Sequence, residues 1–252
     1  MMGAPREGWA LFMWLREASN LAGLWGGHGQ DRRGRAAATM LIALNRRMFL
    51  ALNASAHPYA ALVLLAKFAA VWAVYVAMTL VAGLWIWGRP HLRGRLLATV
   101  GGVSLALGIN QILGMLWYEK RPFAIGLGHV LIPHAADNSF PSDHATFIWS
   151  LGFSLILAVA ADGWGVVVLL TGLLVAWARI YLGVHYPIDM ATSLLVSVVG
   201  GALSVALVPV AERFVLPPVE ALYLRMLTLF HLPTRLFPRA SDARDTLPFW
   251  HA

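Results

Sequence analysis

Residues 164–207 read WGVVVLLTGLLVAWARIYLGVHYPIDMATSLLVSVVGGALSVAL, two long apolar runs joined by a short polar segment. Each run is close to the roughly 20 residues that a helix needs to cross a bilayer. The polar segment, residues 179–189, ends one run and begins the next. The pattern predicts two consecutive membrane helices with charged side chains at the turn between them.

Three earlier apolar runs extend this pattern into a bundle. The first could begin at Ala60, but at about 1.5 Å per residue it would overshoot a hydrocarbon layer of roughly 30 Å, so we expect a start near Phe68. The sequence therefore predicts an all-α polytopic membrane bundle of about five transmembrane helices, with interfacial amphipathic helices beside it. The predicted spans are residues 68–87, 96–116, 145–161, 164–182 and 188–207.

The composition excludes several classes of protein. Hydrophobic residues make up 59% of the 252 residues and charged residues 12%, which is far from the balance of a soluble domain. The net charge of +7 comes from arginines scattered between apolar runs, which argues against nucleic-acid binding. Cysteine is absent, so disulfides and thiolate metal sites are excluded. Any metal chemistry would have to use His, Asp and Glu, and we expect no cofactor.

The flanks differ from the apolar middle. We divide the chain into an N-terminal extension (1–43), a membrane-embedded domain (44–210) and a C-terminal part (211–252). Residues 8–25 predict an interfacial helix, and the Gly- and Arg-rich residues 26–35 predict a linker. Near the C-terminus we expect an amphipathic helix lying in the membrane plane, because its polar residues fall within one arc of a helical wheel and apolar residues occupy the rest. These residues are Glu220, Arg225, Thr228 and His231.

Two polar clusters, residues 117–143 and 179–189, interrupt the apolar runs. Between the two clusters, the run 145–161 is predicted to cross the membrane and the run 164–182 to cross back. Both clusters must therefore emerge at the same face of the membrane.

The segment SFPSDHATF, residues 139–147, predicts a helix start. Pro141 prevents a helix from running through from before it, and Ser142 is a favourable N-cap. The unpaired amides and positive dipole end of a helix suit a phosphate. His144, in the first turn, could reach a phosphate held there.

In the second cluster, Tyr186 is expected to cap a helix that Pro187 begins. Asp189 follows His185 by four residues, about one helical turn. A carboxylate at that spacing could accept the imidazole N–H, fix the tautomer and raise the nucleophilicity of the other nitrogen. The pattern indicates a histidine nucleophile.

Basic residues accompany the two histidines. Arg121, Arg179 and Lys120 would form a pocket for a highly charged anion, and phosphate is the natural candidate. An arginine fork matches phosphate oxygens and keeps its proton, so it could neutralise the ground state and the transition state. One histidine would attack and the other would protonate the leaving group.

Three motifs resemble those of the type 2 phosphatidic acid phosphatase superfamily. Pro141-Ser142-Asp143-His144 resembles its Pro-Ser-Gly-His motif, and Arg179-x5-His185-x3-Asp189 matches its third motif. Arg121-Pro122 matches the end of its first motif. Asp143 in place of Gly, within HAADNSFPSDHA, is most similar to the bacitracin-resistance type of undecaprenyl diphosphate phosphatase. The resemblance covers roughly residues 45–207.

Two positions depart from these motifs. The lysine of the first motif falls on Gly114, and the serine before the third-motif arginine is replaced by Ala178. Lys120, adjacent to Arg121, could supply the missing charge.

The resemblance implies a metal-independent phosphatase that acts through a phosphohistidine. It makes His185 the nucleophile, Asp189 its orienting partner and His144 the general acid. It also implies a pocket at the outer membrane surface for a polyprenyl diphosphate lipid whose tail stays among the membrane lipids, in the cytoplasmic membrane of a bacterium. The expected phosphate-binding residues are Arg121, Arg179, Ser142 and Lys120.

Other interpretations remain open. A metal-dependent hydrolase could use His144, His185 and Asp189, although nearby cations would repel a metal. A transporter is disfavoured because the charges lie at span ends. Another lipid, such as phosphatidylglycerol phosphate or phosphatidic acid, is a further candidate substrate. In the long connection, we interpret His134 and Asp137 as loop-folding or head-group contacts.

The residues between the first two spans bear on orientation. Arg89, Arg93 and Arg95 form a positive loop on the face opposite the two polar clusters. By the positive-inside rule this loop is cytoplasmic, which places the site outside.

Overall fold

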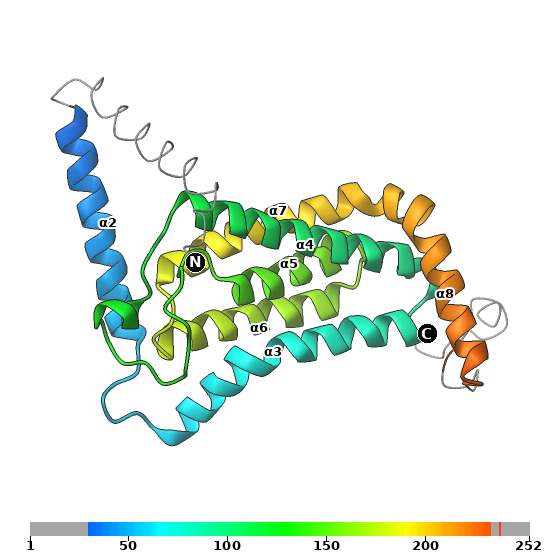
Figure 1. Cartoon of the computed structure of the whole chain (residues 1–252), viewed down its shortest axis with the longest axis horizontal. Helices are drawn as coiled ribbons and strands as arrows, with labels where there is room; N and C mark the ends of the chain where they lie inside the picture. Colours follow the sequence, from blue (N-terminus) through cyan, green and yellow to red (C-terminus); the bar gives the residue numbers. More distant parts are fainter. Residues whose placement is uncertain (1–29, 233–236, 238–252) are drawn as a thin grey trace, which may run out of the picture. The chain divides into compact units, whose positions relative to one another are not determined.

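The computed structural model describes residues 30–232 and Phe237. Within these residues it is a bundle of helices without strands (Figure 1), which confirms the predicted fold class. The predicted helix at 8–25 and the C-terminal tail lie outside the described residues. The chain forms two compact units, residues 1–47 and 48–252.

The helices follow the apolar runs closely. Short 3-10 turns lie at Pro90–Leu92 and Pro122–Ile125, and a π-helical turn at Ala211–Val215 leads from α7 into α8. The α-helices are α2 (Gln30–Leu52), α3 (Ala60–Trp87), α4 (Arg93–Leu116), α5 (Asp143–Leu157), α6 (Asp162–Tyr181), α7 (Pro187–Val210) and α8 (Leu216–Leu229).

Two predicted boundaries are wrong. The predicted linker at 26–35 is helical from Gln30 onward, as the start of α2. Helix α3 begins at Ala60 and not near Phe68. Its N-terminal part has packing partners, because Ala66 and its neighbours join a buried cluster with the end of α6 around Leu182. The helix therefore continues beyond the width of the hydrocarbon layer.

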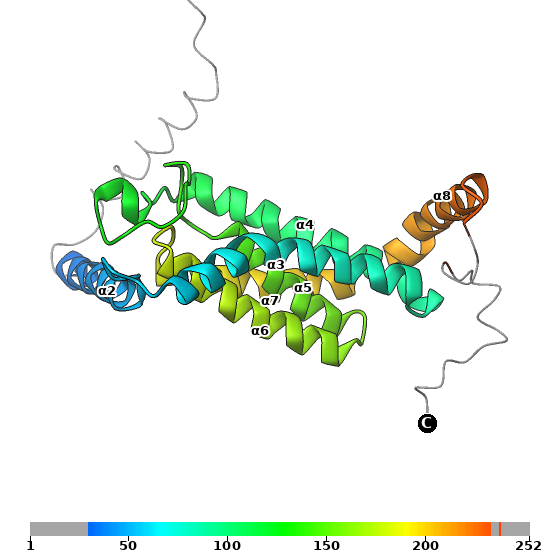
Figure 2. The ribbon, with the colours of Figure 1, turned by 90° about the horizontal axis from the view of Figure 1, so that it is seen from below.

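Four helical segments of the described chain are long and apolar enough to span a membrane: Ala60–Trp87, Pro90–Leu116, Gly163–Tyr181 and Pro187–Leu229. The third predicted span, 145–161, is instead the 15-residue helix α5. At about 1.5 Å per residue, α5 is shorter than a bilayer. It packs against α4, α6 and α7, so neighbouring helices enclose it (Figure 2).

Small residues bring α4 and α7 close to each other. A side chain added at Gly102 of α4 would meet the carbonyl of Gly200 at 2.6 Å and the backbone nitrogen of Ser204 at 2.8 Å. Close backbone approach at small residues is a main source of helix association in lipid, where apolar burial gives little driving force.

Serines then join α7 to α5. The backbone N–H of Ser142 donates to the hydroxyl of Ser193 at 3.0 Å. The hydroxyl of Ser197 lies 3.1 Å from the carbonyl of Thr146 and 2.6 Å from the carbonyl of Ser193 in its own helix. Further along, the hydroxyls of Ser154 and Ser204 lie 2.7 Å apart. These buried contacts set the register of α5 against α7.

At the end of the bundle opposite the long connection, Arg93 is not a free loop charge. Its side chain is 1% exposed and bonds Glu220 of α8 at 2.7 Å. The guanidinium also lies over the rings of Trp85 and Tyr223, with centroid distances of 5.4 and 5.0 Å. Arg93 therefore ties α8 to the turn between α3 and α4, and the positive loop has fewer exposed charges than its sequence suggests.

The close approach at Gly102 can be tested. Gly102→Ala is expected to destabilise the protein by about 1–3 kcal/mol because the new methyl group overpacks the α4–α7 contact. The midpoint of thermal unfolding in detergent measures this loss. Gly108→Ala on the same helix is the control, since an added methyl group there meets nothing within 4 Å. Equal unfolding midpoints for the two variants would contradict the packing described.

Candidate active site

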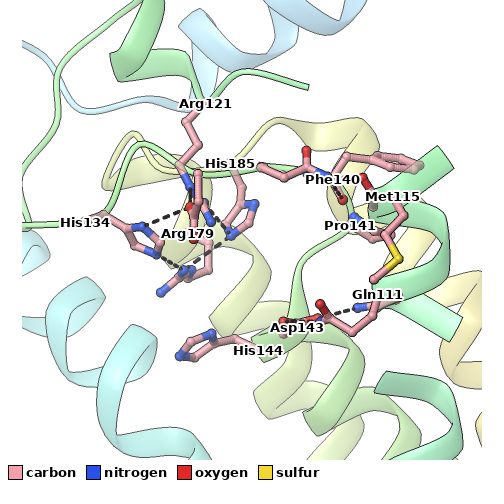
Figure 3. A pocket seen from close by; sticks show the side chains of 14 residues that line it. Gln111, Met115, Arg121, His134, Phe140, Pro141, Asp143, His144, Arg179 and His185 are labelled. Atoms are coloured by element: carbon pink, nitrogen blue, oxygen red, sulfur yellow. Dashed lines mark hydrogen bonds and ion pairs between the residues drawn. The ribbon is translucent and has the colours of Figure 1, made fainter. Parts of the chain in front are cut away.

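The long connection between α4 and α5 and the turn between α6 and α7 meet at one end of the bundle. Between them lies a cavity of about 420 Å³. Arg121 and His134 enter it from the connection, His144 from α5, Arg179 from the end of α6 and His185 from the turn (Figure 3). The structure thus brings both polar clusters into one pocket.

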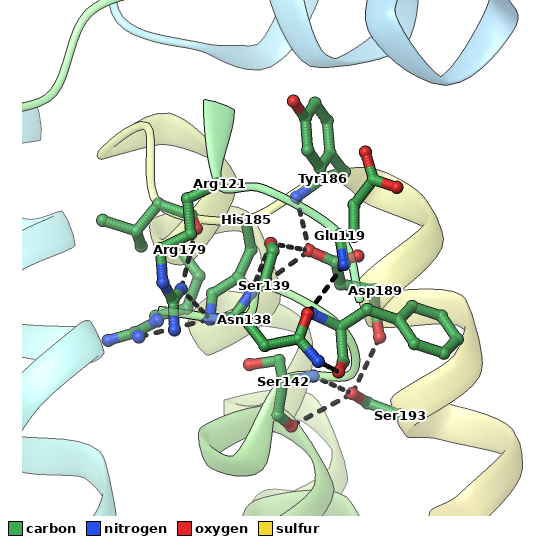
Figure 4. A network of polar contacts seen from close by, with 12 residues as sticks. Glu119, Arg121, Asn138, Ser139, Ser142, Arg179, His185, Tyr186, Asp189 and Ser193 are labelled. Carbon is green, nitrogen blue, oxygen red and sulfur yellow. Dashed lines mark hydrogen bonds and ion pairs between the residues drawn. The ribbon is translucent and has the colours of Figure 1, made fainter. Parts of the chain in front are cut away.

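His185 is held at both ring nitrogens (Figure 4). Nδ1 lies 3.2 Å from Oδ2 of Asp189. Nε2 lies 3.2 Å from Nη1 of Arg121 and 3.3 Å from Nη2 of Arg179. Because guanidinium groups only donate, Nε2 is the acceptor, and the hydrogen sits on Nδ1 facing the carboxylate. The lone pair of Nε2 therefore points at the two cations.

Asp189 is completely buried in the first turn of α7. Its Oδ2 accepts the backbone N–H of Tyr186 at 2.8 Å and the hydroxyl of Ser139 at 2.5 Å. Pro187 at the first helical position begins α7. The carboxylate thus cannot turn away from His185 without losing these bonds.

The arginines are oriented by the connection and the turn. Nε of Arg121 donates to Asp137 at 2.7 Å, and its Nη1 donates to the carbonyl of Val184 at 2.9 Å. Nη2 of Arg179 lies 3.0 Å from Nε2 of His134. Both arginines are almost fully buried.

Among the residues that line the pocket, Nε of Arg179 and Oδ1 of Asn110 are buried and lack a hydrogen-bond partner among the described residues. The hydroxyl of Ser142 is also buried without a partner, but Ser142, a predicted phosphate-binding residue, is not among the residues that line the pocket. A buried donor without a partner costs roughly 1–3 kcal/mol. An anion with several oxygens, such as a phosphate, would satisfy the donor of Arg179.

Ser142 occupies the N-cap of α5, but its side chain makes no capping hydrogen bond. Instead, its backbone N–H and carbonyl both bond the hydroxyl of Ser193, each at 3.0 Å. The hydroxyl of Ser193 therefore holds the backbone of the N-cap residue, while the predicted side-chain cap is not formed.

Asp143, which stands where the superfamily motif has Gly, lines the pocket. Its two oxygens accept the side-chain amides of Asn110 at 2.9 Å and Gln111 at 3.2 Å. Two polar residues of α4 therefore bind the carboxylate that stands where the motif has Gly.

Lys120 is placed differently from the other candidates. It is exposed, pairs through its backbone with Asn138, and is not among the residues that line the pocket. At Gly114, the motif's lysine position, an added Cβ would lie 3.0 Å from the side-chain nitrogen of Asn138. The long connection covers the place from which the motif's lysine would project.

The charges of Arg121 and Arg179 also affect the pKa of His185. Burial, followed by the charges of Arg179 and Arg121, holds the pKa of His185 well below its ordinary value. A neutral imidazole is the form that can act as a nucleophile. The surroundings of His185 therefore favour the neutral ring that attack requires.

Three functional candidates come from the long connection and were not assigned to chemistry from the sequence. Ser139 bonds Asp189, Asp137 bonds Arg121, and His134 contacts Arg179. In the sequence these residues are marked only by the concentration of polar residues between two apolar runs. That concentration does not show which side chain each residue contacts.

Comparisons with known proteins show the family of the chain. Residues 95–213 match the PAP2 superfamily. Undecaprenyl-diphosphatase BcrC of Bacillus subtilis (strain 168) is 33% identical over 161 residues, covering 64% of this chain and 82% of that protein. The chain belongs to the PAP2 superfamily. It is therefore a multi-pass membrane phosphatase that acts on lipid phosphates.

Two further proteins extend the comparison. Putative undecaprenyl-diphosphatase YbjG of Escherichia coli (strain K12) is 34% identical over 162 residues, covering 64% of this chain and 81% of that protein. The crystal structure of Aquifex aeolicus LpxE is similar in fold, with a TM-score of 0.51 at 24% identity, covering 65% of this chain and 95% of that chain.

The contact between Ser139 and Asp189 gives a prediction. Ser139→Ala is expected to lower kcat by about 10-fold with little change in KM, since a hydrogen bond to a charged group contributes roughly 1.5 kcal/mol or more. Ser139→Thr, which keeps the hydroxyl, is the matched variant and should retain more activity. Steady-state phosphate release from a lipid substrate measures both. An unchanged kcat in Ser139→Ala would show that the contact has no role in catalysis.

Proposed function

We propose that this PAP2 protein hydrolyses undecaprenyl diphosphate to undecaprenyl phosphate and inorganic phosphate, in the recycling of a lipid carrier for cell-wall synthesis. The names of the BcrC and YbjG relatives support the substrate. The observation that carries the chemistry is the placement of His185, with Nε2 against two guanidiniums and Nδ1 against Asp189.

In the first step, Nε2 of His185 attacks the terminal phosphorus. The bond from that phosphorus to the bridging oxygen breaks, and a protonated His144 gives its proton to the leaving oxygen. Arg121 and Arg179 stabilise the charge that develops on the transferred phosphoryl group. Asp189 stabilises the His185 ring as it becomes positively charged.

In the second step, water attacks the phosphorus of the phosphohistidine. Neutral His144 takes a proton from the water as the P–N bond breaks. Inorganic phosphate leaves, and His185 is restored with its hydrogen on Nδ1.

The nucleophile assignment makes a direct prediction. His185→Ala should abolish phosphate release while the protein stays folded, because no other described residue places a nitrogen between the two arginines. His144→Ala should lose about 10²–10⁴ in rate with KM little changed, the usual contribution of a general acid. Acid quenching of wild-type protein during turnover should trap acid-labile phosphate that His185→Ala lacks. Substantial turnover by His185→Ala would contradict the mechanism.

A substrate panel tests the lipid. Purified protein is given undecaprenyl diphosphate, phosphatidylglycerol phosphate and phosphatidic acid in turn, each with and without excess EDTA. We expect the highest kcat/KM for undecaprenyl diphosphate and no loss in EDTA. A preference for either phospholipid would reject the proposed substrate, and loss of activity in EDTA restored by a divalent ion would favour the metal-dependent alternative.

We further propose that the site faces the exterior of a bacterial cytoplasmic membrane. The basic turn between α3 and α4 at the other end of the bundle supports this orientation. Since the chain has no cysteine, an introduced thiol is the only target for a membrane-impermeant maleimide.

Ala124→Cys in the long connection and His91→Cys in the basic turn introduce exposed thiols at opposite ends of the bundle. In intact cells the reagent is expected to label Ala124→Cys and to spare His91→Cys. Both variants should react after the cells are broken, which is the control. The reverse pattern in intact cells would place the site in the cytoplasm.

A further inference from the structure

His134 lies in the active-site pocket but has no part in the two chemical steps. Its Nδ1 lies 3.1 Å from the carbonyl of Ala135, and its Nε2 lies 3.0 Å from Nη2 of Arg179. The carbonyl accepts and the guanidinium donates, so the hydrogen sits on Nδ1 and Nε2 carries the lone pair. His134 thus acts as a hydrogen-bond acceptor for Arg179, a role that a phosphate oxygen could also fill.

His134 and His185 lie on opposite sides of the Arg179 guanidinium (Figure 3). The same Nη2 of Arg179 lies 3.3 Å from Nε2 of His185. The two imidazole rings stand edge to face, with centroids 6.4 Å apart. A phosphate attacked by His185 would take over Nη2, and His134 would then face the side of the substrate that points away from the nucleophile.

Charge favours a second role for His134 once the substrate enters. Burial and the cations Arg121 and Arg179 hold the pKa of His134 below its ordinary value, while Asp137 and the carbonyl of Ala135 oppose them. The other titratable groups at the pocket are His144, His185 and Asp143. A diphosphate brings several negative charges next to the ring, which favours its protonated form. Protonated from solvent, Nε2 becomes a charged donor.

We propose that His134 binds the second phosphate of a diphosphate head group, the one that stays with the lipid, and so makes the site selective for diphosphates over monophosphates. The inference rests on the proposed function, because it takes a lipid diphosphate as the substrate. His134 lines the same cavity of about 420 Å³ as His144 and His185, and this volume leaves room for a second phosphate beside the first.

Calorimetric titration of the purified full-length protein tests this. The probes are methylenediphosphonate, a diphosphate analogue that is not hydrolysed, and inorganic phosphate. His134→Gln can still accept from Arg179 through its side-chain oxygen but cannot carry a charge, and His134→Ala removes both functions. His129→Gln is the matched control, because His129 is an exposed histidine of the same connection and does not line the pocket.

We expect His134→Gln and His134→Ala to weaken methylenediphosphonate binding by about 10- to 100-fold, the loss of one charge-assisted hydrogen bond. Inorganic phosphate binding should change by less than about 3-fold in His134→Gln. Proton uptake on diphosphonate binding, measured in buffers of different ionisation enthalpy, should be lower in both variants than in wild type and His129→Gln.

Wild-type affinity in His134→Gln would overturn the proposal, since His134 would then only support Arg179. Equal weakening of both anions in His134→Gln would overturn it too. Because neither probe carries a lipid tail, the result is independent of which lipid the protein hydrolyses. A failure of undecaprenyl diphosphate as substrate is therefore distinguishable from a failure of His134 as the diphosphate-binding residue.

Discussion

Hydrogen bonds between α5 and α7 fix the distance and register on which the pocket depends. The hydroxyl of Ser193 in α7 accepts the backbone N–H of Ser142, and the hydroxyl of Ser197 lies within hydrogen-bond distance of the carbonyl of Thr146. Sliding α5 along α7 would separate these buried groups. Lipid supplies little apolar driving force between helices, which leaves such bonds and close packing to hold them. Since α5 carries His144 and α7 carries Asp189, these contacts also hold the general acid and the orienting carboxylate of the proposed mechanism in one arrangement.

The second constraint is electrostatic. The pocket gathers two buried arginines around a neutral histidine, and each arginine is fixed by the backbone or by a side chain of the long connection. Donors that are already in place need no reorganisation when charge develops on a phosphoryl group. The helices provide the frame, and the connection between α4 and α5 sets the direction of the cations.

Local spacing was enough to place the groups at helix ends. His185 and Asp189 are one turn apart, and Pro187 marks the start of α7, so their contact follows from short-range geometry. The sequence also predicted the helical bundle, but not that α5 is shorter than a bilayer, because neighbouring helices rather than lipid enclose it. The contacts of Ser139 and His134 depend on how residues 117–142 fold over the bundle. That path relies on long-range bonds such as the one from Asn138 to Gly114, which no local pattern reveals.

The carboxylate of Asp143 has a consequence for the end of the reaction cycle. Asn110 and Gln111 hold this negative group at the wall of a pocket that also contains the cations Arg121 and Arg179. A site built only of cations would bind free phosphate tightly and empty slowly. We expect repulsion from Asp143 to offset part of that attraction, so that the product departs more readily and the pocket is free sooner for the next lipid.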